Sequence, residues 1–217
     1  MKARTAPARC ALARGEAEGP AGTPVENASS PTAGYTTWRA AGSESRPVAP
    51  DDSPTAPFDP AGVLSLLARL GVETSTCEHE PVLTVAEAKL ATAHVPGCHC
   101  KNLFLEERGG STWLVVLRED KPLDLRALSV ALGTRRLSFA SPEKLRTRLG
   151  IATGSVSPLA VVNDPEGKVR VVLDRELLSR PALKFHPLAN TKTTVVSPDG
   201  LLRFLEARRH PPLLVDL

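Results

Sequence analysis

Residues 102–117, NLFLEERGGSTWLVVL, contain two apolar runs on either side of a short polar segment. The first run covers residues 102–106 and the second covers residues 112–117, and short runs of apolar, β-branched and aromatic residues are typical of strands. Residues 106–110, EERGG, supply the glycines with which a chain reverses direction. The stretch therefore predicts a β-hairpin.

Four further β-rich runs lie toward the C-terminus. They are LAVVN, KVRVVLD, TTVV and PLLVDL, at residues 159–163, 168–174, 193–196 and 212–217. The segment NDPEG at residues 163–167 separates the first two of these runs, and we interpret it as the turn of a second hairpin.

Five segments carry the signals that begin a helix. Four of them have a capping Asp or Ser before an apolar face, and TVAE at residues 84–87 is a capping box. The expected starts are Asp59-Pro60, Thr84, Asp124, Ser141-Pro142 and Ser197-Pro198, with glycine ends at Gly71, Gly133 and Gly150. Helices mixed with a hairpin and separated strands predict a single α+β domain, with a mixed, curled, barrel-like sheet surrounded by helices.

Composition excludes several classes of protein. None of the 217 residues belongs to an apolar run long enough for a membrane span, so no membrane partner is expected. The net charge of +3 permits contact with nucleic acid but is low for a protein that binds duplex DNA. Four cysteines are too few for a disulfide framework in a chain of this length. We therefore expect a reduced, cytoplasmic protein that does not bind DNA.

Residues 1–57 differ in composition from the rest of the chain. They are rich in Ala, Pro, Ser, Thr and Gly, and their only aromatic residues are Tyr35 and Trp38. Such a segment buries too little apolar surface to offset its ordering entropy, so we expect a disordered Pro/Ala-rich extension before a folded domain at residues 58–217. The Arg-rich start is compatible with a transit peptide, but a dispensable tail or an upstream start codon is the preferred interpretation.

Two short motifs suggest chemistry that their spacing does not support. His94 and the triplet Cys98-His99-Cys100 lie within seven residues, but structural zinc sites use wider cysteine pairs and a second matching pair. We therefore predict no metal and interpret the triplet as a chance cluster in the loop before the first strand. The segment GSVSP at residues 154–158 has Pro158 where the nucleophile elbow of a serine hydrolase needs glycine. No glycine-rich phosphate loop is present, and no cofactor is predicted.

Four motifs taken together resemble the YbaK/ProX family of free-standing aminoacyl-tRNA editing domains. They are KNLFL, RLSFAS, GSVSP and FHPLANT at residues 101–105, 136–141, 154–158 and 185–191, and the resemblance runs from about residue 58 to the C-terminus. The last motif is similar to the ProX branch, which removes alanine mischarged onto tRNA for proline. The resemblance implies the fold of that family and the CCA end of this tRNA as partner, with prolyl-tRNA synthetase as a further candidate.

The resemblance also implies the roles of individual residues. Lys101 corresponds to the catalytic lysine, which would hold the terminal phosphate of the tRNA. His186 would narrow the amino-acid pocket so that alanine fits and proline does not. Asn102 and Asn190 are weaker candidates, as substrate contacts or turn caps. The substrate loop would consist of Gly154, Ser155, Val156, Ser157 and Pro158.

No dedicated base is visible in the sequence, and the family implies that a vicinal hydroxyl of the tRNA helps to activate water. Two alternatives remain open. The enzyme could act on another small mischarged amino acid such as cysteine or serine, or the domain could be a non-catalytic module that binds the tRNA end or the synthetase.

Overall fold

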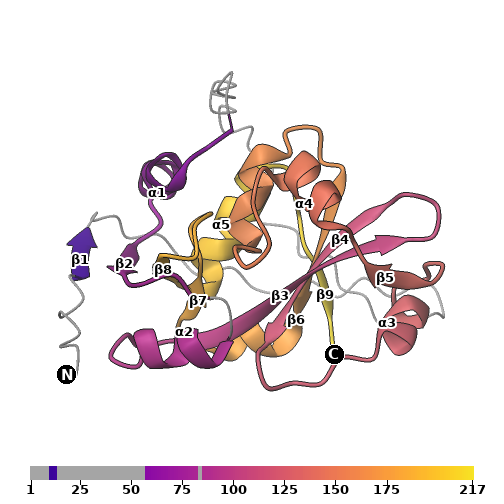
Figure 1. Ribbon diagram of the computed structural model, residues 1–217, viewed down its shortest axis with the longest axis horizontal. Coiled ribbons are helices and arrows are strands. Elements are labelled where there is room, and N and C mark those ends of the chain that lie inside the picture. The colour runs from indigo at the N-terminus through magenta and orange to yellow at the C-terminus, as the bar shows by residue number, and fades with distance from the viewer. Residues whose placement is uncertain (1–9, 14–56, 83–84) are drawn as a thin grey trace, which may run out of the picture.

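A computed structural model of the chain describes residues 10–13, 57–82 and 85–217. Its strands form one mixed sheet in the order β1-β2-β8-β7-β3-β4-β6-β9, with β5 paired to β3 outside this path. The pairs β3–β7, β4–β6 and β6–β9 are parallel, and the other pairs are antiparallel. The sheet curls, and helices lie around it (Figure 1), so the predicted α+β architecture is confirmed. The strands are β1 Cys10–Ala13, β2 Thr74–Glu78, β3 Cys98–Glu107, β4 Thr112–Arg118, β5 Leu137–Phe139, β6 Val169–Asp174, β7 Leu183–Phe185, β8 Lys192–Val196 and β9 Leu213–Val215.

The helices begin where the capping signals predict. Each of the capping side chains Asp59, Asp124, Ser141 and Ser197 accepts a hydrogen bond from a backbone N–H in the first turn of its helix. Thr84, which would begin the capping box, lies outside the described residues. None of the helices in the described part of the chain is long and apolar enough to cross a membrane. The helices are α1 Pro60–Arg69, α2 Val85–Ala91, α3 Leu125–Ala131, α4 Pro142–Leu149 and α5 Pro198–Ala207, with the 3₁₀ helices η1 Pro158–Asn163 and η2 Arg175–Ser179.

The run at residues 159–163 is a 3₁₀ helix, so its prediction as a strand is wrong. Ser157 caps this helix by accepting from the N–H of Leu159 at 3.2 Å, and Pro158 occupies its first turn. Every residue from Pro158 to Val162 is buried, and an apolar run that is buried on all sides has the same sequence pattern in a strand and in a helix. Residues 164–167 do form a turn, but it joins η1 to β6 instead of closing a hairpin.

Three short strands, β2, β5 and β7, were not predicted, and part of the N-terminal extension is also a strand. Residues Cys10–Ala13 form β1 and pair with β2 at the edge of the sheet, where the sequence predicts no regular structure. The prediction of disorder for the rest of residues 1–57 concerns positions outside the described residues, apart from Pro57.

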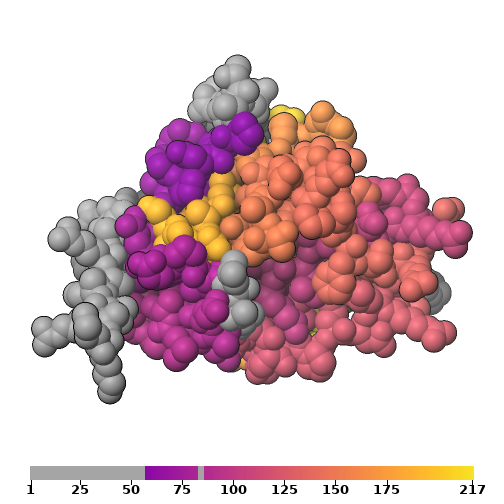
Figure 2. All heavy atoms as spheres, in the orientation of Figure 1, coloured from indigo at the N-terminus to yellow at the C-terminus, as the bar shows by residue number. Residues whose placement is uncertain are grey.

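The two faces of β3 and β4 belong to two separate apolar cores. Phe104 and Leu114 contribute to a larger core with residues of α1, α4, α5 and η1, while Leu105 and Trp113 contribute to a smaller one with residues of α3. This alternation follows from the two-residue period of a strand. The surface around α4, in orange, lies beside the yellow surface where β8 and α5 are located (Figure 2), and α4 and α5 both contribute residues to the larger core.

Candidate functional site

One edge of β3 is only partly covered by neighbouring strands. Its first residues, Cys98 and His99, pair with β7, and its last three residues, 105–107, pair with β5. Between these two partners, residues 100–103 have no strand partner on this edge within the described part of the chain, while the other edge pairs with β4. The sheet therefore has a gap at the point where the KNLFL motif begins.

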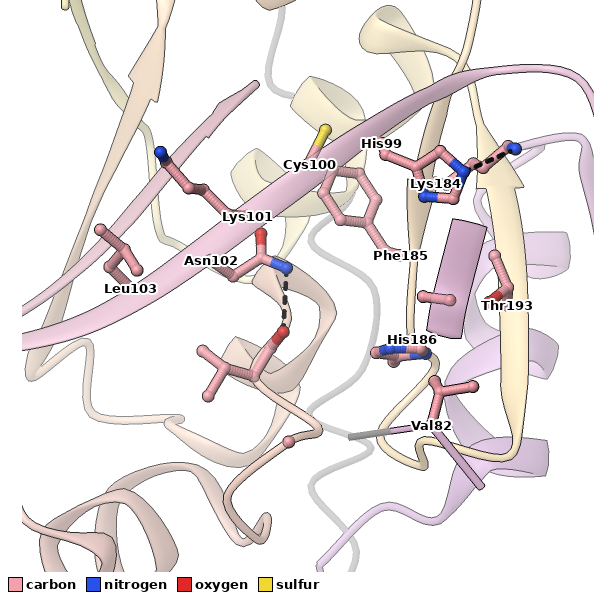
Figure 3. A pocket seen from close by; sticks show the side chains of 13 residues that line it. Val82, His99, Cys100, Lys101, Asn102, Leu103, Lys184, Phe185, His186 and Thr193 are labelled. Carbon is pink, nitrogen blue, oxygen red and sulfur yellow. Dashed lines mark hydrogen bonds between the residues drawn. The ribbon is translucent and has the colours of Figure 1, made fainter. Parts of the chain in front are cut away.

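A cavity of about 280 Å³ opens at this gap. Its walls come from the start of β3, from β7 and β8, from the region of α2, and from the loop before η1 (Figure 3). No Asp or Glu is among the described residues that line it. The lining residues are Val82, Ala88, His99, Cys100, Lys101, Asn102, Leu103, Gly154, Val156, Lys184, Phe185, His186 and Thr193.

Asn102 joins the open edge of β3 to the predicted substrate loop. Its Nδ2 donates a hydrogen bond to the backbone oxygen of Val156 at 2.9 Å (Figure 3). Its Oδ1 is buried and has no hydrogen-bond partner among the described residues. Gly154 has φ of 92°, a conformation that side chains other than glycine rarely adopt, and it lies in the cavity wall. Two of the five predicted loop residues, Gly154 and Val156, thus line the cavity.

The other three residues of this loop have structural contacts away from the cavity. Ser155 is buried, and its N–H donates to the oxygen of Ala152 at 3.1 Å. Ser157 and Pro158 are buried as the cap and the first residue of η1. These three residues hold the conformation of the loop, and they are not part of the cavity lining.

His186 lies across the cavity from this loop. Its Nδ1 donates to the oxygen of Lys192 at 2.8 Å, which leaves Nε2 as an acceptor. Burial lowers the pKa of His186 below the usual 6.5, the hydrogen bond to Lys192 opposes this in part, and His79, with its ring centroid 6.1 Å away, adds a smaller lowering of the pKa. The imidazole is therefore neutral at neutral pH. A neutral ring of fixed orientation suits a wall that receives a small uncharged side chain.

Asn190 lies behind the cavity wall instead of in it. Its Nδ2 donates to the oxygen of Val82 at 3.0 Å, and the N–H of Val82 donates to the oxygen of Asn190 at 3.2 Å. Because Val82 lines the cavity, this paired contact holds one wall in place. Of the two roles that the sequence left open for Asn190, the geometry favours the structural one.

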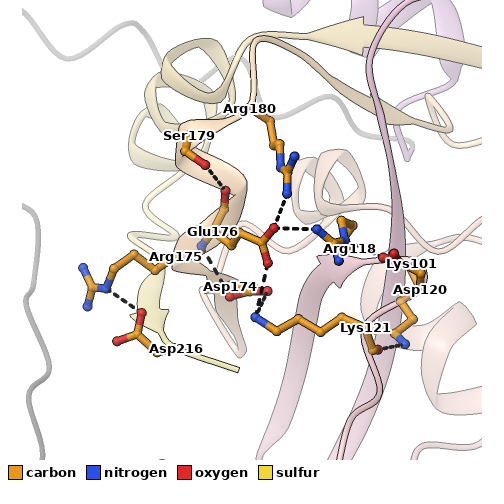
Figure 4. Close-up of polar contacts among 10 residues, drawn as sticks. All are labelled: Lys101, Arg118, Asp120, Lys121, Asp174, Arg175, Glu176, Ser179, Arg180 and Asp216. Carbon is orange, nitrogen blue, oxygen red and sulfur yellow. Dashed lines mark hydrogen bonds and ion pairs between the residues drawn. The ribbon is translucent and has the colours of Figure 1, made fainter.

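Lys101 borders the cavity, but its ammonium group is directed toward the loop that follows β4. Its Nζ donates to the backbone oxygen of Lys121, which follows β4 in the chain (Figure 4). β4 pairs with the edge of β3 that lies opposite the gap. Lys121 is itself anchored by an ion pair of 2.8 Å with Asp174, whose side chain is buried. Glu176 accepts from Arg118 at 2.6 Å in the same network. The structure thus separates the ammonium of Lys101 from the Asn102 and His186 side chains, which face the cavity.

Several lining residues were not predicted from the sequence. The triplet Cys98-His99-Cys100 begins β3 instead of lying in a loop, and His99 and Cys100 reach the cavity. Lys184 and Phe185 directly precede His186, and Thr193 is on the adjacent β8. The position of Lys184 directly before the FHPLANT motif was the one sequence feature that could have pointed to any of these unpredicted lining residues. Within the described ranges, no three His, Cys, Asp or Glu side chains are grouped as metal ligands.

Residues 79–204 match the family model of the aminoacyl-tRNA editing domain. The chain is 40% identical over 152 residues to prolyl-tRNA synthetase associated domain-containing protein 1 of Danio rerio, covering 69% of this chain and 83% of that protein. It is 35% identical over 156 residues to the prolyl-tRNA editing protein ProX of Acetoanaerobium sticklandii, covering 71% of this chain and 95% of that protein.

A solved structure has the same fold. A candidate trans-editing enzyme for prolyl-tRNA synthetase superposes with a TM-score of 0.58 at 23% sequence identity, covering 75% of this chain and 98% of that one. At this level of identity the likeness concerns the fold.

Proposed function

The chain belongs to the aminoacyl-tRNA editing domain family and is related to the ProX editing proteins, and we propose that it is a trans-editing deacylase. In this proposal it hydrolyses the ester of alanine mischarged onto tRNA for proline, in the cytoplasm. The observation that carries the proposal is the cavity at the open edge of β3, to which three separate motifs of the sequence contribute Asn102, Gly154, Val156 and His186. Prolyl-tRNA synthetase, named in the description of a relative, is the proposed protein partner.

The chemistry that these groups support is hydrolysis of an activated ester by water. The backbone at Gly154 has no side chain to block a close approach, so its amides can stabilise the oxyanion that develops on the ester carbonyl. Because no carboxylate is among the described lining residues, the vicinal hydroxyl of the terminal ribose is the proposed activator of water. Neutral His186 can accept a hydrogen bond through Nε2.

Lys101 is proposed to position the tRNA at the cavity mouth. It borders the cavity, and none of the described carboxylates forms an ion pair with it. Its ammonium is held by a single backbone carbonyl, which compensates its positive charge only in part. A phosphate near the mouth would compete with this carbonyl for the ammonium.

The walls of the cavity support the proposed specificity for a small amino acid. Val82, Phe185 and His186 are bulky and line it, which supports a site that excludes large amino-acid side chains. The direction of the Lys101 ammonium favours a second candidate, a module that binds the tRNA end without hydrolysis.

A deacylation panel tests the proposal. The full chain is incubated with tRNA for proline charged with alanine, cysteine, serine or proline, and the remaining ester is measured over time. We expect rapid loss of alanine and retention of proline. We expect the ratio of these two rates to fall about tenfold in His186→Ala, because the larger cavity admits proline. Tight binding of every charged tRNA without ester loss would favour the non-catalytic module, and rapid loss of cysteine or serine alone would reassign the substrate.

A further inference from the structure

Lys184 is a buried lysine in the wall of the cavity. It is only 6% exposed, and its position in β7 is directly opposite His99 of β3. Its Nζ donates to the oxygen of Thr92 at 3.1 Å and lies 3.1 Å from Nε2 of His99 (Figure 3). None of the described carboxylates forms an ion pair with it.

The charges around Lys184 do not neutralise it. Cys98 and, to a smaller extent, Glu119 raise its pKa, but no described carboxylate forms an ion pair with it, and the carboxylate of Glu119 is ion-paired with Lys89. Burial lowers the pKa of Lys184 below 10.5, and burial together with Lys184 lowers the pKa of His99 below 6.5. His99 is therefore neutral at neutral pH and can accept from the ammonium.

This arrangement leaves Lys184 partly unsatisfied. An ammonium has three N–H donors, and the described contacts use two of them. A buried cation without a counter-charge is costly unless an anion compensates it, and this cation borders a cavity large enough for a ligand. The free donor and the uncompensated charge together favour an anionic group in the cavity.

We propose that Lys184 is an anion contact of the cavity and binds a phosphate of the nucleotide that enters it, with His99 holding the ammonium in place. The inference rests on the proposed function, because the substrate proposed there ends in a nucleotide whose phosphate lies close to the ester. It adds a second cation to Lys101, whose ammonium is held toward the other edge of β3.

Equilibrium binding of adenosine 5′-monophosphate, adenosine and inorganic phosphate to the full chain tests this proposal. We expect the wild type to bind the monophosphate more tightly than adenosine. In Lys184→Met the affinity for the monophosphate should fall about tenfold or more, the usual loss for a hydrogen bond to a charged group. Lys168→Met removes an exposed lysine that is paired with Glu166 away from the cavity, and it should bind as the wild type does.

Three results would overturn the proposal. They are equal affinity of the wild type for adenosine and its monophosphate, a preference for the monophosphate that survives in Lys184→Met, and loss of that preference in Lys101→Met alone. Inorganic phosphate bound as tightly as the monophosphate would indicate a free-anion site and would overturn the nucleotide assignment.

Folding of the variant does not limit the test. The oxygen of Thr92 also accepts from the N–H of Val95 at 3.0 Å, so methionine leaves this oxygen with a partner. As a second measurement, side-chain NMR signals of Lys184 in the wild type should shift on addition of the monophosphate, and unchanged signals would refute the contact. None of these measurements requires turnover. Absent deacylation with intact Lys184-dependent binding would therefore refute the proposed function alone.

Discussion

Replacing Asn102 by alanine should separate the role of the substrate loop from general stability. The variant removes the 2.9 Å hydrogen bond from Asn102 to the oxygen of Val156, which links the open edge of β3 to the loop. A hydrogen bond contributes about 1 kcal/mol net, and a buried acceptor that is left without a donor costs somewhat more. We therefore expect the free energy of unfolding to decrease by about 1–2 kcal/mol.

Asn163 offers a matched control. Its Nδ2 donates to the oxygen of Leu149 at 3.0 Å, and its Oδ1 accepts from the N–H of Phe58 at 2.7 Å, but it does not line the cavity. Asn163→Ala should therefore cost a similar free energy of unfolding, about 1–3 kcal/mol. Both variants change an amide side chain to a methyl group, and Asn163→Ala removes two hydrogen bonds where Asn102→Ala removes one.

The two variants should differ in catalysis. A loop displaced by about 1 Å can cost about a hundredfold in rate, so we expect kcat/KM on Ala-charged tRNA to fall about 10- to 100-fold in Asn102→Ala and to stay near wild type in Asn163→Ala. Urea unfolding gives the stability, and hydrogen exchange should show faster exchange of the amides at residues 154–158 only in Asn102→Ala. Full activity of Asn102→Ala, or equal losses of activity in both variants, would refute the assignment of the loop.

Two further predictions follow from the side chains of the cavity. Lys101→Ala should lower the rate of deacylation of every accepted charged tRNA by about 30- to 1,000-fold, because the loss of a positioning charge costs about 2–4 kcal/mol of transition-state stabilisation. Single-turnover kinetics would measure this rate. An unchanged rate would show that Lys101 is not part of the site. The pKa values of His99 and His186 are lowered in the folded state, so folding favours their neutral forms. The stability that they contribute is present above pH 6.5 and is lost as the pH falls from this value toward the lowered pKa values. The urea midpoint of the wild type should therefore decrease in this pH range, and the midpoint of His186→Ala should decrease by a smaller amount.

The local parts of this fold could be predicted because their causes are local. The caps at Asp59, Ser141 and Ser197 act on backbone groups a few residues away, and the turn at residues 106–110 joins two adjacent strands. Sequence motifs also located five residues that line the cavity, Lys101, Asn102, Gly154, Val156 and His186. The run at residues 159–163 was misjudged because complete burial removes the periodicity that distinguishes a strand from a helix.

The site itself depends on contacts between distant parts of the chain. The gap in β3 exists because β7 covers its first residues and β5 covers its last ones, and no local pattern encodes where two such partners end. The same pairing places Lys184 beside His99, 85 residues apart in sequence, and His99 and Cys100 of the triplet line the cavity. It also directs Lys101 toward Lys121. The sequence by itself predicted the helix caps and the hairpin of β3 and β4, whereas the tertiary structure decided which side chains face the cavity, because the facing of a side chain is set by nonlocal strand pairing.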